Sequence, residues 1–249
     1  MVIDPRISII EDRFRNVKAI LCIVSSKGGV GKTLFSCASA LVLGKMNYSV
    51  GLLDLDFTNP SCHIVLGVNL EDYMPVEDKG IVPRKIHGIY FITMAFYTRD
   101  EPLPLRGQYV DEAFKELLAI TRWPDIDFLI IDMPPGIRDE ILNVFKFIPK
   151  ASFVVISTPD ILSIKSAERL LKLLKESGVD VIGILCNMCR DNEKPIVNLA
   201  QKMGVIYLGK VGFYDDIAAK IGEPAGLVNH KFSDDVKNII IKIINGKAT

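Results

Sequence analysis

The run Ser25–Thr33, Ser-Ser-Lys-Gly-Gly-Val-Gly-Lys-Thr, is the most informative segment of this chain for its fold. It follows the apolar segment Ala19–Val24, which has the composition of a buried strand, and precedes Leu34–Leu43, which has helical character. A glycine loop between a strand and a helix is the setting that a phosphate-binding loop requires. Glycines let backbone N–H groups turn inward, and these donors form an anion cradle with the N-terminus of the following helix. The segment therefore predicts a nucleotide-binding site.

The end of this loop predicts how a nucleotide is held. Lys32 is expected to reach the β- and γ-phosphates, and the hydroxyl of Thr33 is expected to bind Mg²⁺. The strict pattern has glycine where this chain has Ser26, so the loop is a variant of the usual form. The cofactor-binding residues predicted for the loop are Gly28, Gly29, Val30, Gly31, Lys32, Thr33 and Leu34.

Length and charge narrow the class of protein. The chain has 249 residues, is 49% hydrophobic, and carries 30 basic and 30 acidic residues. The balanced charge gives no clear signal for nucleic-acid binding. No apolar stretch approaches the about 18 residues of a membrane span, and the charged N-terminus lacks a signal-peptide core. Five cysteines without a disulfide spacing favour a reducing, cytoplasmic location.

Short apolar runs alternate with helical segments along the chain. Several runs are almost continuously apolar, which is typical of parallel strands covered on both faces. We therefore expect an α/β fold with a doubly wound, mostly parallel sheet and helices on both faces, the architecture of P-loop NTPases. One domain would span residues 1–249, with a lead-in at 1–17 and a long, partly helical loop at 56–88. Further strands are expected at Val50–Leu53, Ile89–Ala95, Phe128–Ile131, Phe153–Ser157, Val181–Cys186 and Val205–Leu208. Helices are expected at Thr33–Lys45, Gly107–Thr121, Arg138–Phe147, Ile161–Ser177 and Lys194–Met203.

Two strands end in acidic residues that suit a metal–phosphate site. Asp54 and Asp56 close Gly51–Asp56, and Asp132 closes the apolar strand before Met133-Pro-Pro-Gly136. An aspartate at a strand end can hold Mg²⁺ through water. A pair of solvated turn acids is the alternative for Asp54 and Asp56.

The loop Lys27–Thr33 resembles the deviant Walker A loop of the Mrp/MinD/ParA ATPases. In that family the first lysine reaches the nucleotide of a partner subunit, so the resemblance implies a homodimer and a catalytic role for Lys27 in trans. A second hydroxyl is usual in the family where this chain has Leu34, so one contact to the α-phosphate is absent.

The acid motifs extend the resemblance and favour the Mrp-like, iron–sulfur carrier branch. Leu52–Gly67 is similar to the Mrp pattern around its two aspartates, and Asp132–Gly136 is similar to the family's Walker B and switch segment. The resemblance implies that Asp56 activates the attacking water and that Asp54 and Asp132 lie at the Mg²⁺ with Thr33. It also implies that Asn187 contacts the adenine edge, whereas a simple turn asparagine is the alternative from its position after a strand.

The cysteines depart from the family pattern. Cys186 and Cys189 form a C-x-x-C pair that could hold a metal or cluster, but Mrp-type carriers place their pair further along. Cys186 falls on a predicted strand and is interpreted as a buried small hydrophobic residue. We therefore expect no resident iron–sulfur cluster. The segment Ser233–Asn245 is interpreted as a helix docked on the core, with a membrane-surface helix as the alternative.

Two functions follow from the sequence. The first is a Mg²⁺-dependent ATPase with ATP and ADP as ligands, acting as a nucleotide-sandwich homodimer on an unidentified client in iron–sulfur or metal-cofactor maturation. The alternative is a MinD/ParA-like positioning or partitioning switch that controls a membrane, DNA or protein partner. The catalytic residues expected for either are Lys27, Lys32 and Asp56.

Overall fold

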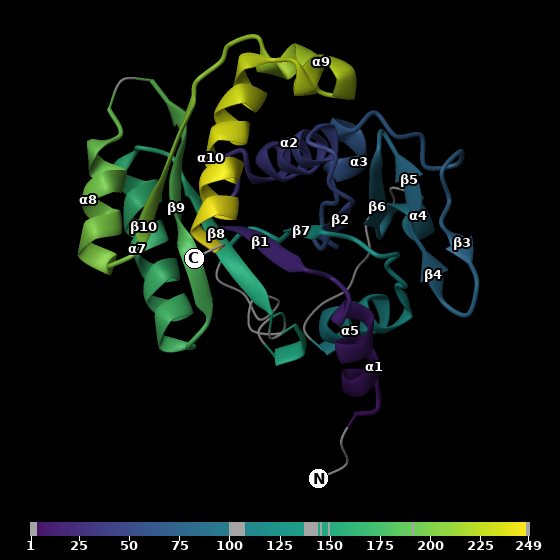
Figure 1. Cartoon of the computed structure of the whole chain (residues 1–249). Helices are drawn as coiled ribbons and strands as arrows, with labels where there is room; N and C mark the ends of the chain where they lie inside the picture. The colour runs from purple at the N-terminus through teal and green to yellow at the C-terminus, as the bar shows by residue number, and fades with distance from the viewer. Residues whose placement is uncertain are drawn as a thin grey trace.

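A mostly parallel sheet forms the centre of the protein (Figure 1). The computed structural model describes residues 4–99, 108–136, 144, 146–148, 150–190 and 192–247. Within these residues the sheet has eight strands in the order β10-β9-β8-β1-β7-β2-β6-β5, and β5 alone pairs antiparallel with its neighbour. The predicted α/β fold class is confirmed. The strands are β1 (Ala19–Ser25), β2 (Val50–Asp54), β5 (Arg84–Ile86), β6 (Ile89–Thr93), β7 (Phe128–Asp132), β8 (Ala151–Ser157), β9 (Asp180–Cys189) and β10 (Ile206–Gly212).

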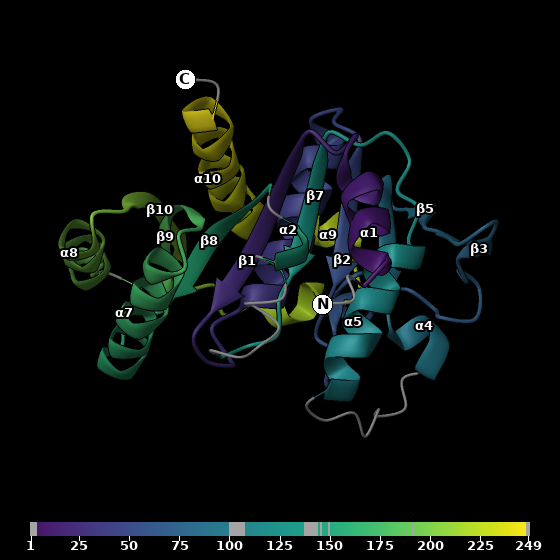
Figure 2. The same ribbon diagram turned by 90° about the horizontal axis from the view of Figure 1, so that it is seen from below.

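Helices cover both faces of the sheet (Figures 1 and 2). The chain passes from β1 to β2 in one direction and from β8 through β9 to β10 in the other. Because such crossovers are right-handed, the connecting helices lie on opposite faces. One face carries α2 (Lys32–Lys45), α9 (Pro224–Val228) and α10 (Lys231–Lys247), and the other carries α1 (Arg6–Phe14), α5 (Gln108–Ile120), α7 (Ile161–Glu176) and α8 (Lys194–Met203).

The reversal of direction creates a switch point between β1 and β8. In open α/β sheets, ligands bind outside the carboxyl ends of strands at such a point. The glycine loop after β1 lies there, and β8 ends beside it at Ser157. The fold thus positions the predicted phosphate loop where a nucleotide site is expected.

The region 56–88 has more structure than the sequence predicted. It contains α3 (Cys62–Val65), a small hairpin of β3 (Val76–Glu77) and β4 (Ile81–Val82), and the edge strand β5. His87 and Gly88 join β5 to β6, both with positive φ (50° and 87°), as a two-residue primed turn requires. The interpretation as a loop was therefore incomplete, because the paired runs are too short to show alternation.

Three further segments bear on the sequence predictions. Part of the expected lead-in is helix α1, which buries Ile10 and Phe14 and packs on α5. The helix expected at 138–147 lies mostly outside the described residues. Helix α10 buries Val236 and Ile240 and packs on β10 and α2, in agreement with the interpretation as a helix docked on the core. Among the described helices, none has both the length and the apolar character needed to cross a membrane.

Candidate nucleotide-binding site

The glycine loop has a backbone conformation that favours glycine at two positions, and at one of them a side chain would also collide with a neighbour. Gly29 and Gly31 have φ values of 80° and 81°, in the left-handed region that favours glycine. Gly31 precedes the first residue of α2 and accepts a hydrogen bond from Phe35 N at 3.0 Å. A Cβ on Gly31 would lie 2.4 Å from Asn187 Nδ2, so the loop and the end of β9 approach closely.

Asp132 gathers three side chains from the start of α2. Its Oδ1 accepts hydrogen bonds from Lys32 Nζ at 2.8 Å and from Ser36 Oγ at 2.7 Å, and its Oδ2 accepts one from Thr33 Oγ1 at 2.8 Å. Lys32 and Asp132 are both buried. Burial by itself lowers the pKa of Lys32, but the charge and hydrogen bond of Asp132 outweigh it, so the pKa is raised overall. The predicted phosphate lysine is therefore charged and held at the base of the loop.

Asp54 lies on the neighbouring strand, in register with Asp132. Its carboxylate accepts hydrogen bonds from the backbone N–H groups of Asp56, Ser61 and Cys62, each at 3.1 Å. Burial, followed by the charge of Asp132, raises the pKa of Asp54 to about 7. Two buried carboxylates thus stand side by side, an arrangement that favours a cation between them.

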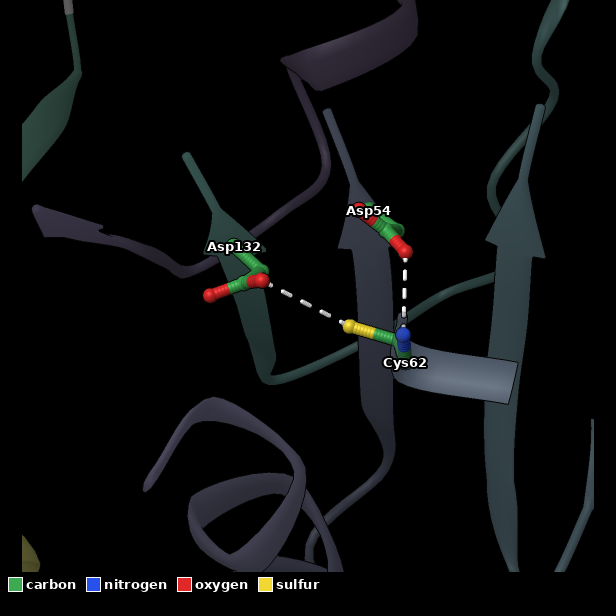
Figure 3. Close-up of side chains that lie close together, drawn as sticks. All are labelled: Asp54, Cys62 and Asp132. Atoms are coloured by element: carbon green, nitrogen blue, oxygen red, sulfur yellow. Dashed lines mark hydrogen bonds between the residues drawn. The ribbon is translucent and has the colours of Figure 1, made fainter. Parts of the chain in front are cut away.

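Cys62 is a residue that sequence reasoning missed. It begins α3 and places its Sγ 3.7 Å from Asp132 Oδ2 (Figure 3). Burial raises the pKa of this thiol well above its usual value. Its place eight residues after Asp54, inside the motif that predicted the acids, was the available signal. The side chains of Asp54, Cys62 and Asp132 form a group whose ligand atoms all lie within 4.8 Å of one another.

Asp56 occupies the turn that follows β2. Its Oδ1 accepts hydrogen bonds from Thr58 Oγ1 at 2.9 Å and from Asn59 N at 3.1 Å, and the residue is 8% exposed. Local hydrogen bonds hold this carboxylate in place, and its backbone N–H donates to Asp54. The turn thereby links the two acids predicted from the sequence.

Lys27 lies apart from the Asp132 cluster. Its Nζ is 3.3 Å from Asp160 Oδ1, at the junction of β8 and α7, and its side chain is 39% exposed. Asp160 also accepts a hydrogen bond from Ser163 N and so caps the N-terminus of α7. Within one subunit, this lysine is directed to the neighbouring helix.

Asn187 contacts the phosphate loop from β9. Its Nδ2 donates a hydrogen bond to the carbonyl oxygen of Val30 at 2.7 Å. Its Oδ1 is buried and has no partner among the described residues. Buried amide oxygens ordinarily accept a hydrogen bond, so this atom is free to accept one from a ligand. Leu34, where the family has a hydroxyl, packs against the core.

A family model described as "ParA: NUBPL iron-transfer P-loop NTPase" matches residues 16–246, the segment that carries the loop and both acidic strands. The chain belongs to this family. An iron–sulfur cluster carrier protein of Saccharolobus solfataricus is 31% identical over 255 residues, covering 94% of this chain and 86% of that protein. An iron–sulfur cluster carrier protein of Pseudomonas fragi is 36% identical over 175 residues, covering 70% of this chain and 61% of that protein. The chain spans about half to two thirds of the length of the first curated relatives it matches.

Two solved structures with bound nucleotide share the fold. A nucleotide-binding protein of Archaeoglobus fulgidus superposes with a TM-score of 0.75 at 24% identity, covering 90% of this chain and 93% of that one. The septum site-determining protein MinD of Pyrococcus horikoshii superposes with a TM-score of 0.65 at 21% identity, covering 93% of this chain and 98% of that one. These similarities confirm the predicted resemblance to the Mrp/MinD/ParA ATPases and the P-loop NTPase architecture.

In this member of the NUBPL family, all five cysteines are buried. Cys186 and Cys189 come to one side of β9 because Met188 has a φ of 54° and the pairing with β10 shifts there. Burial, followed by a hydrogen bond with Cys189, raises the pKa of the Cys186 thiol. The interpretation of Cys186 as a buried residue agrees with the structure.

The structure brings most of the predicted residues of this family member into one place. Lys32, Thr33 and Asp132 are in direct contact, and Asp54 lies beside them. Asn187 reaches the loop at Val30. Lys27 and Asp56 remain at the edges of this group, so their predicted roles require a ligand or a second subunit.

Proposed function

We propose that the chain binds Mg·ATP at the glycine loop and hydrolyses it. The observation that carries this proposal is the contact of Lys32 and Thr33 with Asp132 at the base of the loop. Nucleotides in two structural relatives support it, since the A. fulgidus protein is a complex with ADP and the P. horikoshii MinD a complex with Mg-ADP. Gly28, Gly29 and Gly31 would give the backbone cradle.

The residues present fit a bound Mg²⁺, since buried carboxylates and a hydroxyl are oxygen ligands of the kind it prefers. Thr33, Asp54 and Asp132 would hold it, directly or through water, and Mg²⁺ would neutralise phosphate charge. When the nucleotide binds, the Lys32 ammonium group would leave Asp132 and pair with the phosphates. Asp56, fixed by its turn, would orient the attacking water.

The chain acts, in this proposal, as a homodimer. Lys27 already reaches outward to Asp160, and the next residues, Ile161 and Leu162, are each 72% exposed. A lysine beside two exposed apolar side chains suits a face that a second copy covers, with Lys27 answering the charge on the partner's nucleotide.

The client process follows from the relatives' names. The carrier proteins of S. solfataricus and P. fragi suggest work in iron–sulfur or metal-cofactor protein maturation. A second candidate, a MinD/ParA-like switch acting on a membrane, DNA or protein partner, is favoured by one observation. A cluster passed between proteins needs accessible thiols, and every cysteine of this chain is buried.

ATP binding tests the first step. Lys32→Ala is expected to lose measurable ATP binding in calorimetry, because the phosphates lose their buried cationic partner. Lys45→Ala, at the other end of α2, is the matched control, since Lys45 contacts the exposed Asn229 side chain. Micromolar binding by Lys32→Ala would contradict the assignment of the loop.

The role of Lys27 is tested by pairing two defective subunits. Lys27→Ala protein is mixed with Lys32→Ala protein, so that the loaded site belongs to the subunit lacking Lys27 and its partner still carries that lysine. If such a singly loaded dimer assembles, ATP turnover supports action in trans. Assembly without turnover would count against it.

Cluster and partner assays separate the two candidate functions. Anaerobic reconstitution with iron and sulfide is expected to leave the protein without a stable cluster. A stable brown dimer that requires Cys186 and Cys189 would overturn this expectation and favour cluster carriage. ATP-dependent sedimentation with lipid vesicles or DNA would favour the switch.

A further inference from the structure

Three potential metal ligands, two carboxylates and one thiol, converge near the phosphate loop. Asp54 comes from the end of β2, Asp132 from the end of β7, and Cys62 from the start of α3 (Figure 3). All three are buried, and one ligand atom from each lies within 4.8 Å of the others. The function proposed above uses the two carboxylates and leaves the thiol without a role.

The two oxygens of Asp132 have different neighbours. Oδ1 accepts hydrogen bonds from Lys32 and Ser36, whereas Oδ2 faces both the Thr33 hydroxyl, at 2.8 Å, and the Cys62 thiol, at 3.7 Å. An ion beside Thr33 and Oδ2 would therefore also lie beside the sulfur. Lys32 can stay on Oδ1 while such an ion binds.

The distance between Cys62 Sγ and Asp132 Oδ2 suits two ligands of one metal ion. Zinc–sulfur and zinc–oxygen bonds of about 2.3 and 2.1 Å in a tetrahedral site place the two ligand atoms about 3.6 Å apart. Cys62 Sγ and Asp132 Oδ2 are 3.7 Å apart. The thiol and the carboxylate are thus already spaced for a shared metal.

Charge also favours a divalent cation. Two buried carboxylates lie side by side, and Lys32 makes its ion pair with Asp132. Within the part of the chain that the structure describes, the hydrogen-bond donors to Asp54 are neutral, namely backbone N–H groups and the Thr93 hydroxyl. Burying a carboxylate without a cation is costly, and a divalent ion would remove that cost.

We propose that Cys62 converts this position into a site for a thiophilic divalent transition-metal ion, ligated by Asp54, Cys62 and Asp132. Mg²⁺ takes oxygen ligands, whereas a thiolate selects Fe²⁺, Co²⁺ or Zn²⁺. The inference rests on the proposed function only in sharing Asp54 and Asp132 with the predicted Mg²⁺ site. Mg²⁺ and the softer ion would compete for these two carboxylates.

Cobalt spectroscopy tests the site without nucleotide. Titration of the metal-free full-length protein with Co²⁺ is expected to give a near-ultraviolet sulfur-to-cobalt charge-transfer band at one ion per chain. Cys62→Ser and Cys62→Ala are expected to lose the band. The double variant Cys186→Ser/Cys189→Ser, which removes two buried thiols outside the proposed site, is the matched control and is expected to keep the charge-transfer band.

Affinity gives a second readout. Loss of an outer-shell partner already weakens metal binding by about 10- to 100-fold, so loss of Cys62 is expected to weaken Zn²⁺ binding at least about tenfold in competition with a chromophoric chelator. Circular dichroism establishes that each variant is folded. Should neither Cys62 variant fold, X-ray absorption of the zinc-loaded Cys186→Ser/Cys189→Ser protein decides the matter, with one sulfur neighbour expected.

Several outcomes would overturn the inference. These are the absence of the band in the wild-type protein, its retention in a folded Cys62 variant, and a zinc spectrum with oxygen or nitrogen neighbours alone. Calorimetry with Mg·ATP, in the absence of transition metal, is measured separately. Failure of that binding would count against the proposed function and leave the metal result standing.

Discussion

Gly31 shows how much one residue position is constrained. It has a left-handed backbone, it precedes the helix that carries Lys32 and Thr33, and its α-carbon faces the Asn187 amide. Two separate requirements, one of backbone conformation and one of space, therefore exclude a side chain. The same amide supports the loop through Val30.

Replacing Gly31 with alanine is expected to damage both stability and nucleotide binding. The left-handed conformation costs an L-residue about 1–2 kcal/mol, and the new Cβ must displace Asn187. Urea denaturation and ATP calorimetry measure the two effects. Gly246→Ala is the control, because a Cβ there meets no atom within 4 Å. An unchanged unfolding midpoint in Gly31→Ala would show that the loop has another conformation.

Asp56 is the residue on which hydrolysis is expected to depend. Asp56→Asn preserves the shape of the turn and removes the negative charge. Because the proposed role concerns the attacking water, we expect nearly normal ATP affinity and a fall in kcat of about 10²- to 10⁴-fold. Steady-state phosphate release measures kcat, and calorimetry measures the ATP affinity. A kcat within about threefold of wild type would assign the water to another group.

Among the helices and strands, α7 is capped by a residue that serves two purposes. Asp160 caps the helix through Ser163 N and pairs with Lys27 in the phosphate loop. Its pKa is lowered, first by a hydrogen bond from Thr158 and also by those from Ser163 and Lys27. The stabilisation from this carboxylate is therefore present at neutral pH and lost as the pH falls through its folded-state pKa.

Two substitutions separate these purposes. Asp160→Ala removes the cap and is expected to cost about 1 kcal/mol of stability, whereas Asp160→Asn keeps a capping oxygen and should be almost neutral. Both remove the charge that holds Lys27. Chemical denaturation at pH 7 and at about pH 2 distinguishes them, with the alanine defect smaller at the lower pH, because the carboxylate is protonated only below its ordinary pKa. Equal stability losses for alanine and asparagine would show that the charge dominates.

For the whole molecule, the homodimer proposed above would place a second copy on the exposed start of α7. Ile161 and Leu162 lie beside the phosphate-loop lysine, whereas Ile206, 55% exposed, opens the edge strand β10. Exposed apolar side chains contribute little to the fold of one subunit, so their energetic effect is expected in association.

The double variant Ile161→Ser/Leu162→Ser is expected to weaken ATP-dependent dimerisation at least about tenfold, as loss of about 1.4 kcal/mol would do. Its unfolding midpoint should match the wild type. Analytical ultracentrifugation with a non-hydrolysable ATP analogue measures the association, and Ile206→Ser serves as the control. Dimerisation that is weakened by Ile206→Ser instead would place the interface at the sheet edge.

The phosphate loop, the two acidic strand ends and the doubly wound sheet could all be predicted from the sequence. These features depend on contiguous residues: a glycine loop needs its glycines in order, and a buried strand shows its apolar run locally. The short elements between 56 and 88 escaped prediction because a two-residue turn at His87-Gly88 and strands of two or three residues carry little periodicity.

Which distant residues lie together at the candidate site depends on the tertiary fold and could not be predicted. Asn187 reaches Val30 across 157 residues, Lys27 meets Asp160 across 133, and the Cys62 thiol meets Asp132 across 70. Such contacts depend on the order of strands in the sheet and on the turn that directs α3 under the loop. From the sequence alone, Cys62 cannot be distinguished from an ordinary small core residue. Its chemistry depends on the carboxylates that the fold places beside it, and these are distant in sequence.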